Sequence, residues 1–415
     1  MAQWAEYSTG ERIKMLRGKS TTQASLAEMT GLSVVTIQKA EQDKKLTLPT
    51  LMKIAAALSV DTSVILGQQA PRRAMDQNIR AALRAVSGAV HDAALGFHPE
   101  HTEPVPLPQL AAATERAWDL YWSGQYVELG AILVPLLSEA SVTAQQADGE
   151  DELHALKLLS DAYQIAACAA NLLNSRDLAY AAGGYARAAA LRGGDSLRAA
   201  RVDSALAWVY MRDGRLAESL ALSERAAASV EPSYSDHSAE QLTVYGNLVT
   251  HCAVTAARLE VEDRARDFLS TLHAVGARLG SEHNFHGARF GPVTATTQAV
   301  GVNATMQSAG KALALAKDLE DTQLGALADS ARNRYRLDIA MAQADARMWD
   351  ASLETLERTM LAAPEWSRHQ ALPGVIAQKV GRASTARLRR VMAMIDMPPI
   401  AGMGTLAPPT HKTSR

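Results

Sequence analysis

A helical pattern that recurs in pairs from residue 110 to about 395 most constrains what this chain can fold into. The clearest pair spans 205–232, where two helical stretches flank an Asp-Gly turn. Similar pairs open the array at 117–137 and close it at 339–365, with weaker pairs between them. One pair cannot bury its own apolar face, so neighbouring pairs must stack. The pattern predicts six stacked pairs, with a concave groove lined by the first helix of each pair.

Composition favours helix along the whole chain. The sequence is rich in Ala, which loses no side-chain entropy in a helix, and aromatic residues make up only 5% of it. We therefore expect an all-α fold with almost no strand.

The chain also carries the marks of a protein of the cytosol. Its two cysteines, Cys168 and Cys252, cannot build a disulfide framework or a four-thiolate zinc site, which fits a reducing cytosol. The start of the chain lacks a leader pattern, and no apolar run reaches the roughly 18 residues of a spanning helix, so we expect a cytoplasmic protein that does not enter a membrane.

Charge is divided unevenly along the chain. The formal net charge is −2, but the first 73 residues carry ten Lys and Arg against six Asp and Glu, and the remainder is acidic. Such a charge run is often only a solvated helix face. A local basic segment is also what a DNA-binding domain requires.

Capping residues divide the basic segment into short helices. Thr22 and Ser33 each precede a helical stretch, and Gly31 lies in the tight turn between the two stretches. Further apolar spacing, including a stretch after Pro49, brings the expected number of helices to five. Two helices joined by a tight glycine turn are typical of the helix-turn-helix motif, whose second helix enters the DNA major groove.

The stretch 10–66 resembles the Xre/Cro-type helix-turn-helix domain, in the pattern TQxxLAxxTGLSxxTIxxxE followed by LxxLxKIAxALxV. The resemblance implies that Gln23 reaches a phosphate or a base, and that Arg17 and Glu41 form an internal ion pair. The residues that we expect to bind DNA are Thr22, Gln23, Ser33, Val34, Val35, Thr36, Gln38, Lys39, Lys44 and Lys45.

The sequence departs from that family at two places. Val34 and Val35 stand where the family often has Arg or Gln and a small polar residue, so contact with thymine methyl groups fits better than a bidentate guanine contact. Asp43 replaces the usual Gly, which Asp can do because it tolerates left-handed backbone geometry. The alternative interpretation is a degenerate motif that makes protein contacts.

Four segments are expected. Residues 1–73 form the DNA-binding domain, and 74–109 form a linker helix and a spacer with four prolines. Residues 110–396 form the helical repeat domain, which would sense a ligand and dimerise. Residues 397–415 form a disordered tail.

The repeat region is similar to tetratricopeptide repeats, because 205–232 has their Gly, Glu-Ala-like and closing Pro positions, although the spacing is longer and irregular. This resemblance implies a right-handed α-solenoid. Nearly the whole chain resembles the Xre-type regulators with tetratricopeptide-like C-terminal domains of actinomycetes. In architecture it is similar to the peptide-sensing regulators of Gram-positive bacteria.

Polar side chains at helical spacing are the candidates for a ligand site in the groove, although an ordinary solvated face is the alternative for each of them. They are Asn247, His251, Arg258, Arg289, Asn303, Gln307, Asn333 and Arg336. The loop 281–293 is either a structural cap on the next helix or a loop that closes on the ligand. Its His283 and His286 lack suitable further ligands, so no metal and no cofactor are expected.

No catalytic motif occurs, so we do not expect an enzyme. The sequence predicts a homodimeric transcriptional regulator, expected to repress, that binds double-stranded operator DNA and responds to a peptide or small-molecule effector. Two alternatives remain open: a tetratricopeptide scaffold for other proteins, and a mobile-element repressor controlled by a partner protein.

Overall fold

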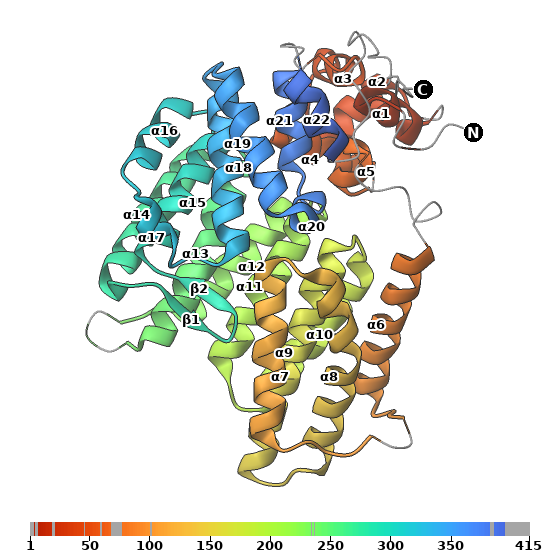
Figure 1. Ribbon diagram of the computed structural model, residues 1–415, viewed down its shortest axis with the longest axis vertical. Helices are drawn as coiled ribbons and strands as arrows, with labels where there is room; N and C mark the ends of the chain where they lie inside the picture. The colour runs from red at the N-terminus through yellow and green to blue at the C-terminus, as the bar shows by residue number, and fades with distance from the viewer. Residues whose placement is uncertain are drawn as a thin grey trace, which may run out of the picture.

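The computed structural model describes residues 4, 7–18, 21–44, 46–58, 60–67, 77–99, 102–233, 235, 237–381 and 386–394. This part of the chain is almost entirely helical (Figure 1). The tail expected at 397–415 lies outside the described residues.

Five short helices form the head, residues 1–67. They are α1 (Thr9–Arg17), α2 (Gln23–Thr30), α3 (Val34–Glu41), α4 (Leu48–Ala57) and α5 (Thr62–Leu66). Side chains cap α1 to α5 at Ser8, Thr22, Ser33, Thr47 and Asp61. The caps expected at Thr22 and Ser33 are confirmed. Asp43 has a φ of 55°, the left-handed geometry expected of it.

Six helix pairs form the body, and their positions agree with the pattern read from the sequence. The pairs are α7 (Leu107–Ser123) with α8 (Tyr126–Gln146), α9 (Glu150–Leu172) with α10 (Arg176–Arg192), α11 (Ser196–Arg212) with α12 (Leu216–Ser229), α13 (Ala239–Arg258) with α14 (Glu262–Leu279), α15 (Pro292–Thr305) with α16 (Ala309–Lys317), and α18 (Asp329–Asp345) with α19 (Trp349–Ala362). Consecutive pairs lie side by side (Figure 1).

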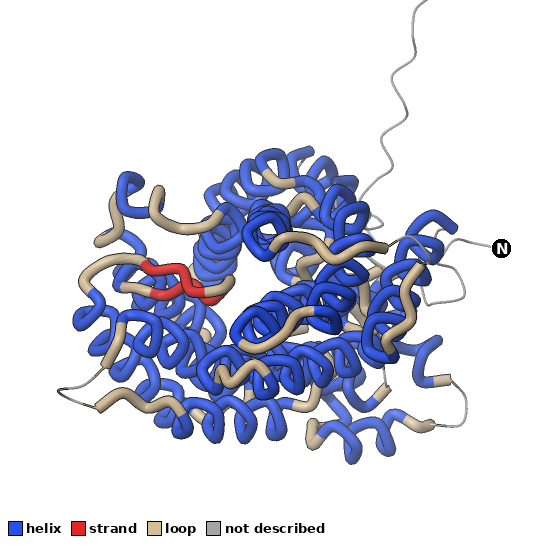
Figure 2. Tube along the Cα trace, turned by 90° about the horizontal axis from the view of Figure 1, so that it is seen from below, coloured by secondary structure: helices blue, strands red, loops and turns tan. Residues whose placement is uncertain are grey.

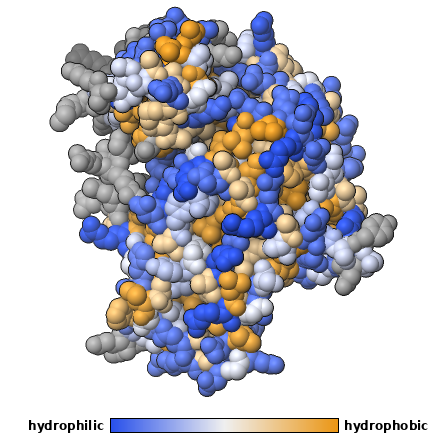
Figure 3. All heavy atoms as spheres, turned by 180° about the vertical axis from the view of Figure 1, so that it is seen from behind, coloured by the Kyte–Doolittle hydropathy of each residue, from blue (hydrophilic) through white to orange (hydrophobic). Residues whose placement is uncertain are grey.

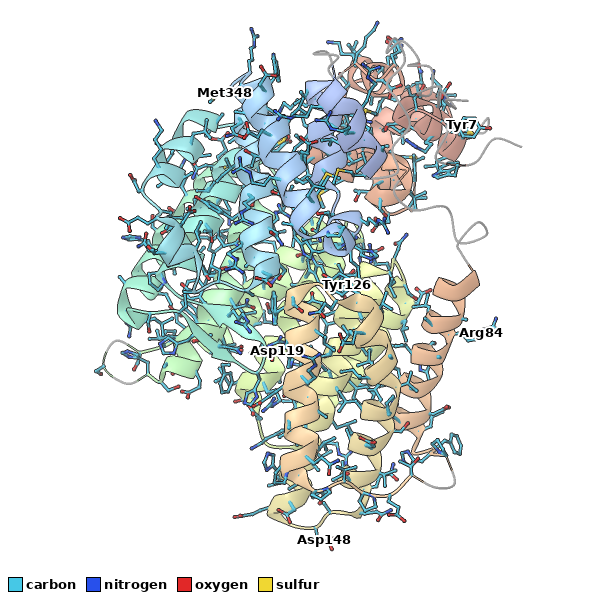
Figure 4. The ribbon with its side chains drawn as sticks, viewed as in Figure 1. Tyr7, Arg84, Asp119, Tyr126, Asp148 and Met348 are labelled. Carbon is cyan, nitrogen blue, oxygen red and sulfur yellow. The ribbon has the colours of Figure 1, made fainter. Side chains whose placement is uncertain are left out.

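Five further helices complete the described part. They are α6 (Gln77–Leu95), α17 (Asp321–Leu324), α20 (Pro364–Arg368), α21 (Leu372–Val380) and α22 (Ala386–Met394). Helix α6 packs against α8 through Val86 and Val90, which are buried in the same apolar cluster as α7 to α11. Arg84 of α6 points outward (Figure 4).

The described residues contain little strand, as expected. The loop 281–293 contains an antiparallel hairpin of β1 (His283–Phe285) and β2 (Ala288–Phe290). Its turn residues His286 and Gly287 both have positive φ, 45° and 79°, as a two-residue type I′ turn requires. Pro292 then begins α15, as expected. The hairpin lies toward the inside of the curved row of helices (Figure 2).

The row of pairs closes on itself. The turn between α7 and α8 meets α20, where the backbone N–H of Val127 donates to Glu365 Oε1 over 2.8 Å and the rings of Tyr126 and His369 lie 5.4 Å apart. Helix α7 also contacts α18. On the other side, the hairpin turn at Gly287 leaves no room for a Cβ atom against Trp118 of α7. The first helices of the pairs therefore surround an interior space.

By length and apolarity, one helix among the described residues, α8, could cross a membrane. Half of that stretch is buried inside the body, against α6, α7 and α9. Its apolarity is thus accounted for by the packing of the core.

The head and the C-terminal helices share one apolar core. Ile13, Leu51 and Ile54 of the head are completely buried in a cluster that also contains Val375 and Leu388. Figure 1 shows the head at one end of the molecule, beside α21 and α22. The head is therefore docked on the body rather than suspended from it.

Candidate functional site

The helix-turn-helix is built by α2, the turn at Gly31 and α3. Gly31 has a φ of 64° and accepts the left-handed geometry that ends α2. Ser33 Oγ accepts from the backbone N–H of Thr36 over 3.1 Å and so begins α3. Inside, Leu26 and Ile37 are fully buried, which fixes how α3 sits on α2.

The outer face of α3 is open to solvent although the head is docked. Val34 and Val35 are 39% and 55% exposed, unusual for such apolar side chains, and Gln38 and Lys39 are exposed beside them. Figure 3 shows apolar side chains among polar ones over the end of the molecule that carries the head. An apolar and amide-bearing helix face of this kind suits the edges of base pairs.

The other expected DNA-binding residues flank this face. Thr22, Ser33 and Lys44 are exposed, Thr36 and Gln23 are half-buried, and Lys45 lies outside the described residues. Their contacts with DNA stay predictions.

A network beneath the face ties α1, α2 and α3 together. Arg17 Nε donates to Glu41 Oε1 over 2.7 Å, so the expected internal ion pair is confirmed. Gln23 Nε2 donates to Glu41 Oε2 over 2.6 Å, and Gln38 Nε2 donates to Gln23 Oε1 over 3.4 Å. Gln23 thus bridges Glu41 and Gln38.

A buried carboxylate joins the head to the body. Asp61 caps α5 by accepting from the backbone N–H of Ser63 over 2.8 Å, and its side chain is fully buried. Arg176 of α10 bonds to it directly, and Arg212 at the end of α11 lies 3.8 Å away. Burial raises the pKa of Asp61, but the two guanidinium groups outweigh that effect, and the pKa lies below its ordinary value.

A central cavity of two adjoining lobes, about 250 and 310 Å³, lies among the helices of the body and is partly open to solvent. All the first helices, α7, α9, α11, α13, α15 and α18, contribute to its wall, and the hairpin contributes as well. Its lining includes Trp118, Tyr121, Trp122, Gln164, Arg201, Trp208, Asn247, His251, Arg258, Arg289, Gln298 and Arg334. Aromatic walls with a few converging polar groups are typical of small-molecule sites.

Half of the eight candidate ligand residues meet at this cavity. Asn247 and His251 line both lobes, and Arg258 and Arg289 line the second. Burial, with Arg258 and Arg201 nearby, lowers the pKa of His251 to about 4, so the ring is neutral at physiological pH.

The other four candidates lie elsewhere. Asn303 is 1% exposed, and its Nδ2 donates to Ala299 O within α15. Gln307 lies beside the head at a small gap near Thr47. Asn333 and Arg336 line an outer depression at the α7–α8 turn.

Several cavity residues were missed from the sequence. Four of the six tryptophans, Trp118, Trp122, Trp208 and Trp366, line the cavity. The Trp-x-x-Tyr-Trp spacing at 118–122 is the one sequence signal that could have indicated them, since it places the first ring one helical turn from the other two. No sequence feature near Arg201 distinguished it from an arginine on a solvated helix face.

The hairpin does not form a metal site. Among the described residues, no three His, Cys, Asp or Glu side chains gather closely enough to hold a metal ion. Nδ1 of His286 instead lies 3.6 Å from Asp161 Oδ2. Cys168 and Cys252 are free and buried, and burial raises their pKa values to about 11 and about 12, which keeps both thiols protonated.

Comparison with known proteins bears on the head alone. Residues 13–65 match a family model described as helix-turn-helix, HTH_3. No curated protein and no solved structure matches the chain. Proteins that carry this domain are generally DNA-binding regulators and not enzymes. The match covers α2, α3, α4 and most of α1 and α5, and together with the geometry of α2 and α3 it shows that this chain begins with an Xre-type helix-turn-helix domain, the DNA-binding domain of a transcription regulator.

Proposed function

We propose that this protein is a sequence-specific transcriptional regulator, acting as a repressor, whose affinity for its operator is controlled by a peptide or small-molecule signal held among the first helices of the body. In this proposal residues 1–73 bind DNA, 74–109 connect the two functions, and 110–396 are a right-handed, tetratricopeptide-like solenoid. The protein works where the DNA is, in the cytoplasm.

One observation supports coupling between the cavity and the head. Helix α11 carries Trp208 in the cavity wall and, one turn later, Arg212 beside Asp61 of the head. The guanidinium of Arg212 lies 5.6 Å from the ring centre of Trp208. A signal that moves Trp208 therefore acts on the charge that holds the head. A signal whose binding free energy differs by about 1–3 kcal/mol between two arrangements of the heads is enough to change operator occupancy several-fold or more.

A homodimer completes the proposal. Two heads about one helical turn apart would read the two halves of a palindromic operator. The acidic body repels DNA and leaves the contact to the basic head.

The test of DNA recognition uses single substitutions on α3. An operator is first selected from random DNA with the purified full-length protein, and affinity is then measured by fluorescence polarisation. Gln38→Ala and Lys39→Ala should each abolish specific binding, and affinity should fall steeply with added salt. Lys311→Ala, which removes an exposed charge from the body, is the matched control and should bind as the unaltered protein does.

Unchanged operator affinity in Gln38→Ala or Lys39→Ala would contradict the assignment of α3. A flat salt profile would contradict DNA binding by the head. A monomeric protein that binds DNA only with a second protein would favour the adaptor alternative.

A further inference from the structure

We propose that the central cavity binds a small aromatic acid, whose anionic group pairs with Arg201 and whose ring lies against the tryptophans of the wall. This inference rests on the proposed function and names the chemical class of its signal.

The first reason is a buried cation with no carboxylate in direct contact. Arg201 is 5% exposed, and no carboxylate among the described residues lies within 4.0 Å of it. Its Nε has no hydrogen-bond partner in the described part of the chain. The nearby Asp161 is bonded instead to Arg198. A buried charge is costly unless it is paired, so a bound anion would supply what the protein itself does not.

The geometry of Arg201 leaves its donors available. Its guanidinium carbon lies 4.5 Å from the centre of the Trp118 ring, in the range of a cation–π contact. Such stacking occupies the face of the guanidinium but not the N–H groups in its plane. Those N–H groups match the two oxygens of a carboxylate.

The second lobe adds positive potential. Arg258 is 9% exposed, and its Nε also has no partner among the described residues. The guanidinium of Arg289 lies 5.9 Å from the centre of the Trp122 ring, and its Nη2 lies 4.0 Å from Asp119 Oδ1. Arg334 is the exception, because it donates to Asp338.

The acidic group in the second lobe is already occupied. Glu282 accepts from the backbone N–H groups of Val293 and Thr294 over 2.8 and 3.0 Å, and from Thr294 Oγ1 over 2.6 Å. It thereby caps α15 and forms no ion pair with the arginines. Among the described residues, neither Arg201 nor Arg258 has a carboxylate within 4.0 Å.

Further unpartnered groups favour an aromatic ligand with polar atoms. The indole N–H groups of Trp118 and Trp122 and Oε1 of Gln164 are buried without a partner in the described structure. Gln164 is completely buried, so its carbonyl faces no bulk water. Flat indole walls stack on a flat ring, and these groups can fix its polar substituents.

The size of the cavity favours a small molecule over an extended peptide. A peptide extends about 3.3 Å per residue and needs a long groove. The two lobes instead match the size of small-molecule sites, roughly 300–1,000 Å³.

The test uses defined probes on the full-length protein without DNA. Indole-3-acetate, its neutral counterpart indole-3-acetamide and the non-aromatic acid hexanoate are titrated by isothermal calorimetry. Indole-3-acetate should bind at least about tenfold more tightly than either of the others, because only it offers both the charge and the ring. Equal affinity of the acid and the amide, stronger binding of hexanoate, or no binding of indole-3-acetate up to about 1 mM, the weak end of specific binding, would overturn the proposal.

Substitution then locates the site. Arg201→Gln should weaken indole-3-acetate about tenfold and leave indole-3-acetamide unchanged. Arg215→Gln is the matched control, because Arg215 also stacks at 4.5 Å, on Tyr210, but outside the cavity and half exposed. Equal loss in both variants, or no loss in Arg201→Gln, contradicts the site. The proposal stays testable even if Arg201→Gln fails to fold, because indole-3-acetate and indole-3-acetamide are also compared on the unaltered protein.

Failure of this inference is distinguishable from failure of the proposed function. Operator affinity is measured on the same preparation with and without indole-3-acetate. If indole-3-acetate binds in the cavity and operator affinity does not change, control by an effector is rejected while the ligand class stands. If specific operator binding is intact and none of the probes binds, the ligand class is rejected and the DNA-binding function stands.

Discussion

Replacement of Asp61 by Asn should weaken the junction between head and body by about 3 kcal/mol. Asn keeps the N-cap of α5, worth about 1 kcal/mol, because its side-chain oxygen can accept from Ser63 as Asp61 does. The substitution removes the charge that compensates Arg176 and Arg212, and it places an Nδ2 donor where Asp61 Oδ2 accepts from Arg176. Breaking a buried ion pair on one side costs about 3–5 kcal/mol.

The lower end of that range applies here. Arg176 keeps its hydrogen bonds to the backbone oxygen and to Oδ1 of Asn171, at 2.5 and 2.7 Å. The Arg176 and Arg212 side chains retain 11% and 14% exposure, which gives water some access to the stranded charges. Burial already lowers the pKa of Arg176 to about 10, which shows how poorly its surroundings solvate the cation.

The assay is urea unfolding at pH 7 followed by circular dichroism and tryptophan fluorescence. A double-mutant cycle with Arg176→Met should recover part of the loss, because the double variant leaves one cation, Arg212, without its counterion rather than two. Asp195→Asn is the matched control: Asp195 caps α11 and lies 3.2 Å from an arginine, Arg198, but far from the head. Since Arg198 keeps Asp161 as a partner, this control should lose less than about 1 kcal/mol. The reasoning is refuted if the free energy of unfolding of Asp61→Asn lies within about 1 kcal/mol of that of the unaltered protein. It is also refuted if Asp61→Asn is no more destabilised than Asp195→Asn.

Two other predictions concern the junction and the cavity. Gly214→Ala should destabilise the protein more than Gly194→Ala, although both glycines have positive φ in turns beside α11. A Cβ at Gly214 would lie 2.3 Å from Cβ of Ala56 in α4, whereas a Cβ at Gly194 meets nothing within 4 Å. Equal losses of stability in urea unfolding would contradict close docking of the head. The free energy of unfolding should fall by about 2 kcal/mol for each of His251 and His369 between pH 7 and pH 5, because burial lowers both pKa values from 6.5 to about 4 and the unfolded chain therefore binds more protons in that window. The pH dependence should be shallower in His251→Gln, and an unchanged profile in that variant would contradict a neutral, buried ring.

The hairpin shows how a local signal can be present and yet be overlooked. His286-Gly287 between Phe285 and Ala288 is a two-residue turn with both φ values positive. An alanine-rich composition argues for helix on average, but it says nothing about a three-residue strand. Composition therefore predicted the dominant helix correctly, whereas only the turn chemistry could indicate this short hairpin.

The amino-acid sequence by itself determined the helices, their caps and the helix-turn-helix. These features depend on residues within a turn or two of each other: Thr22 and Ser33 satisfy backbone N–H groups nearby, and helical spacing places Leu26 and Ile37 on inward faces. The ion pair of Arg17 with Glu41 followed from resemblance within the same short domain.

Only the tertiary structure decided which side chains meet across the body and which face of a helix is buried. Asn303 and His251 have the same polar character in sequence, yet one is bonded within its own helix and the other faces the cavity. Asp61 and Arg176 are 115 residues apart, and their contact depends on where the head docks. Such contacts are set by the summed packing angles of successive helices, because each small angle moves every later helix, and no local pattern of residues specifies that sum.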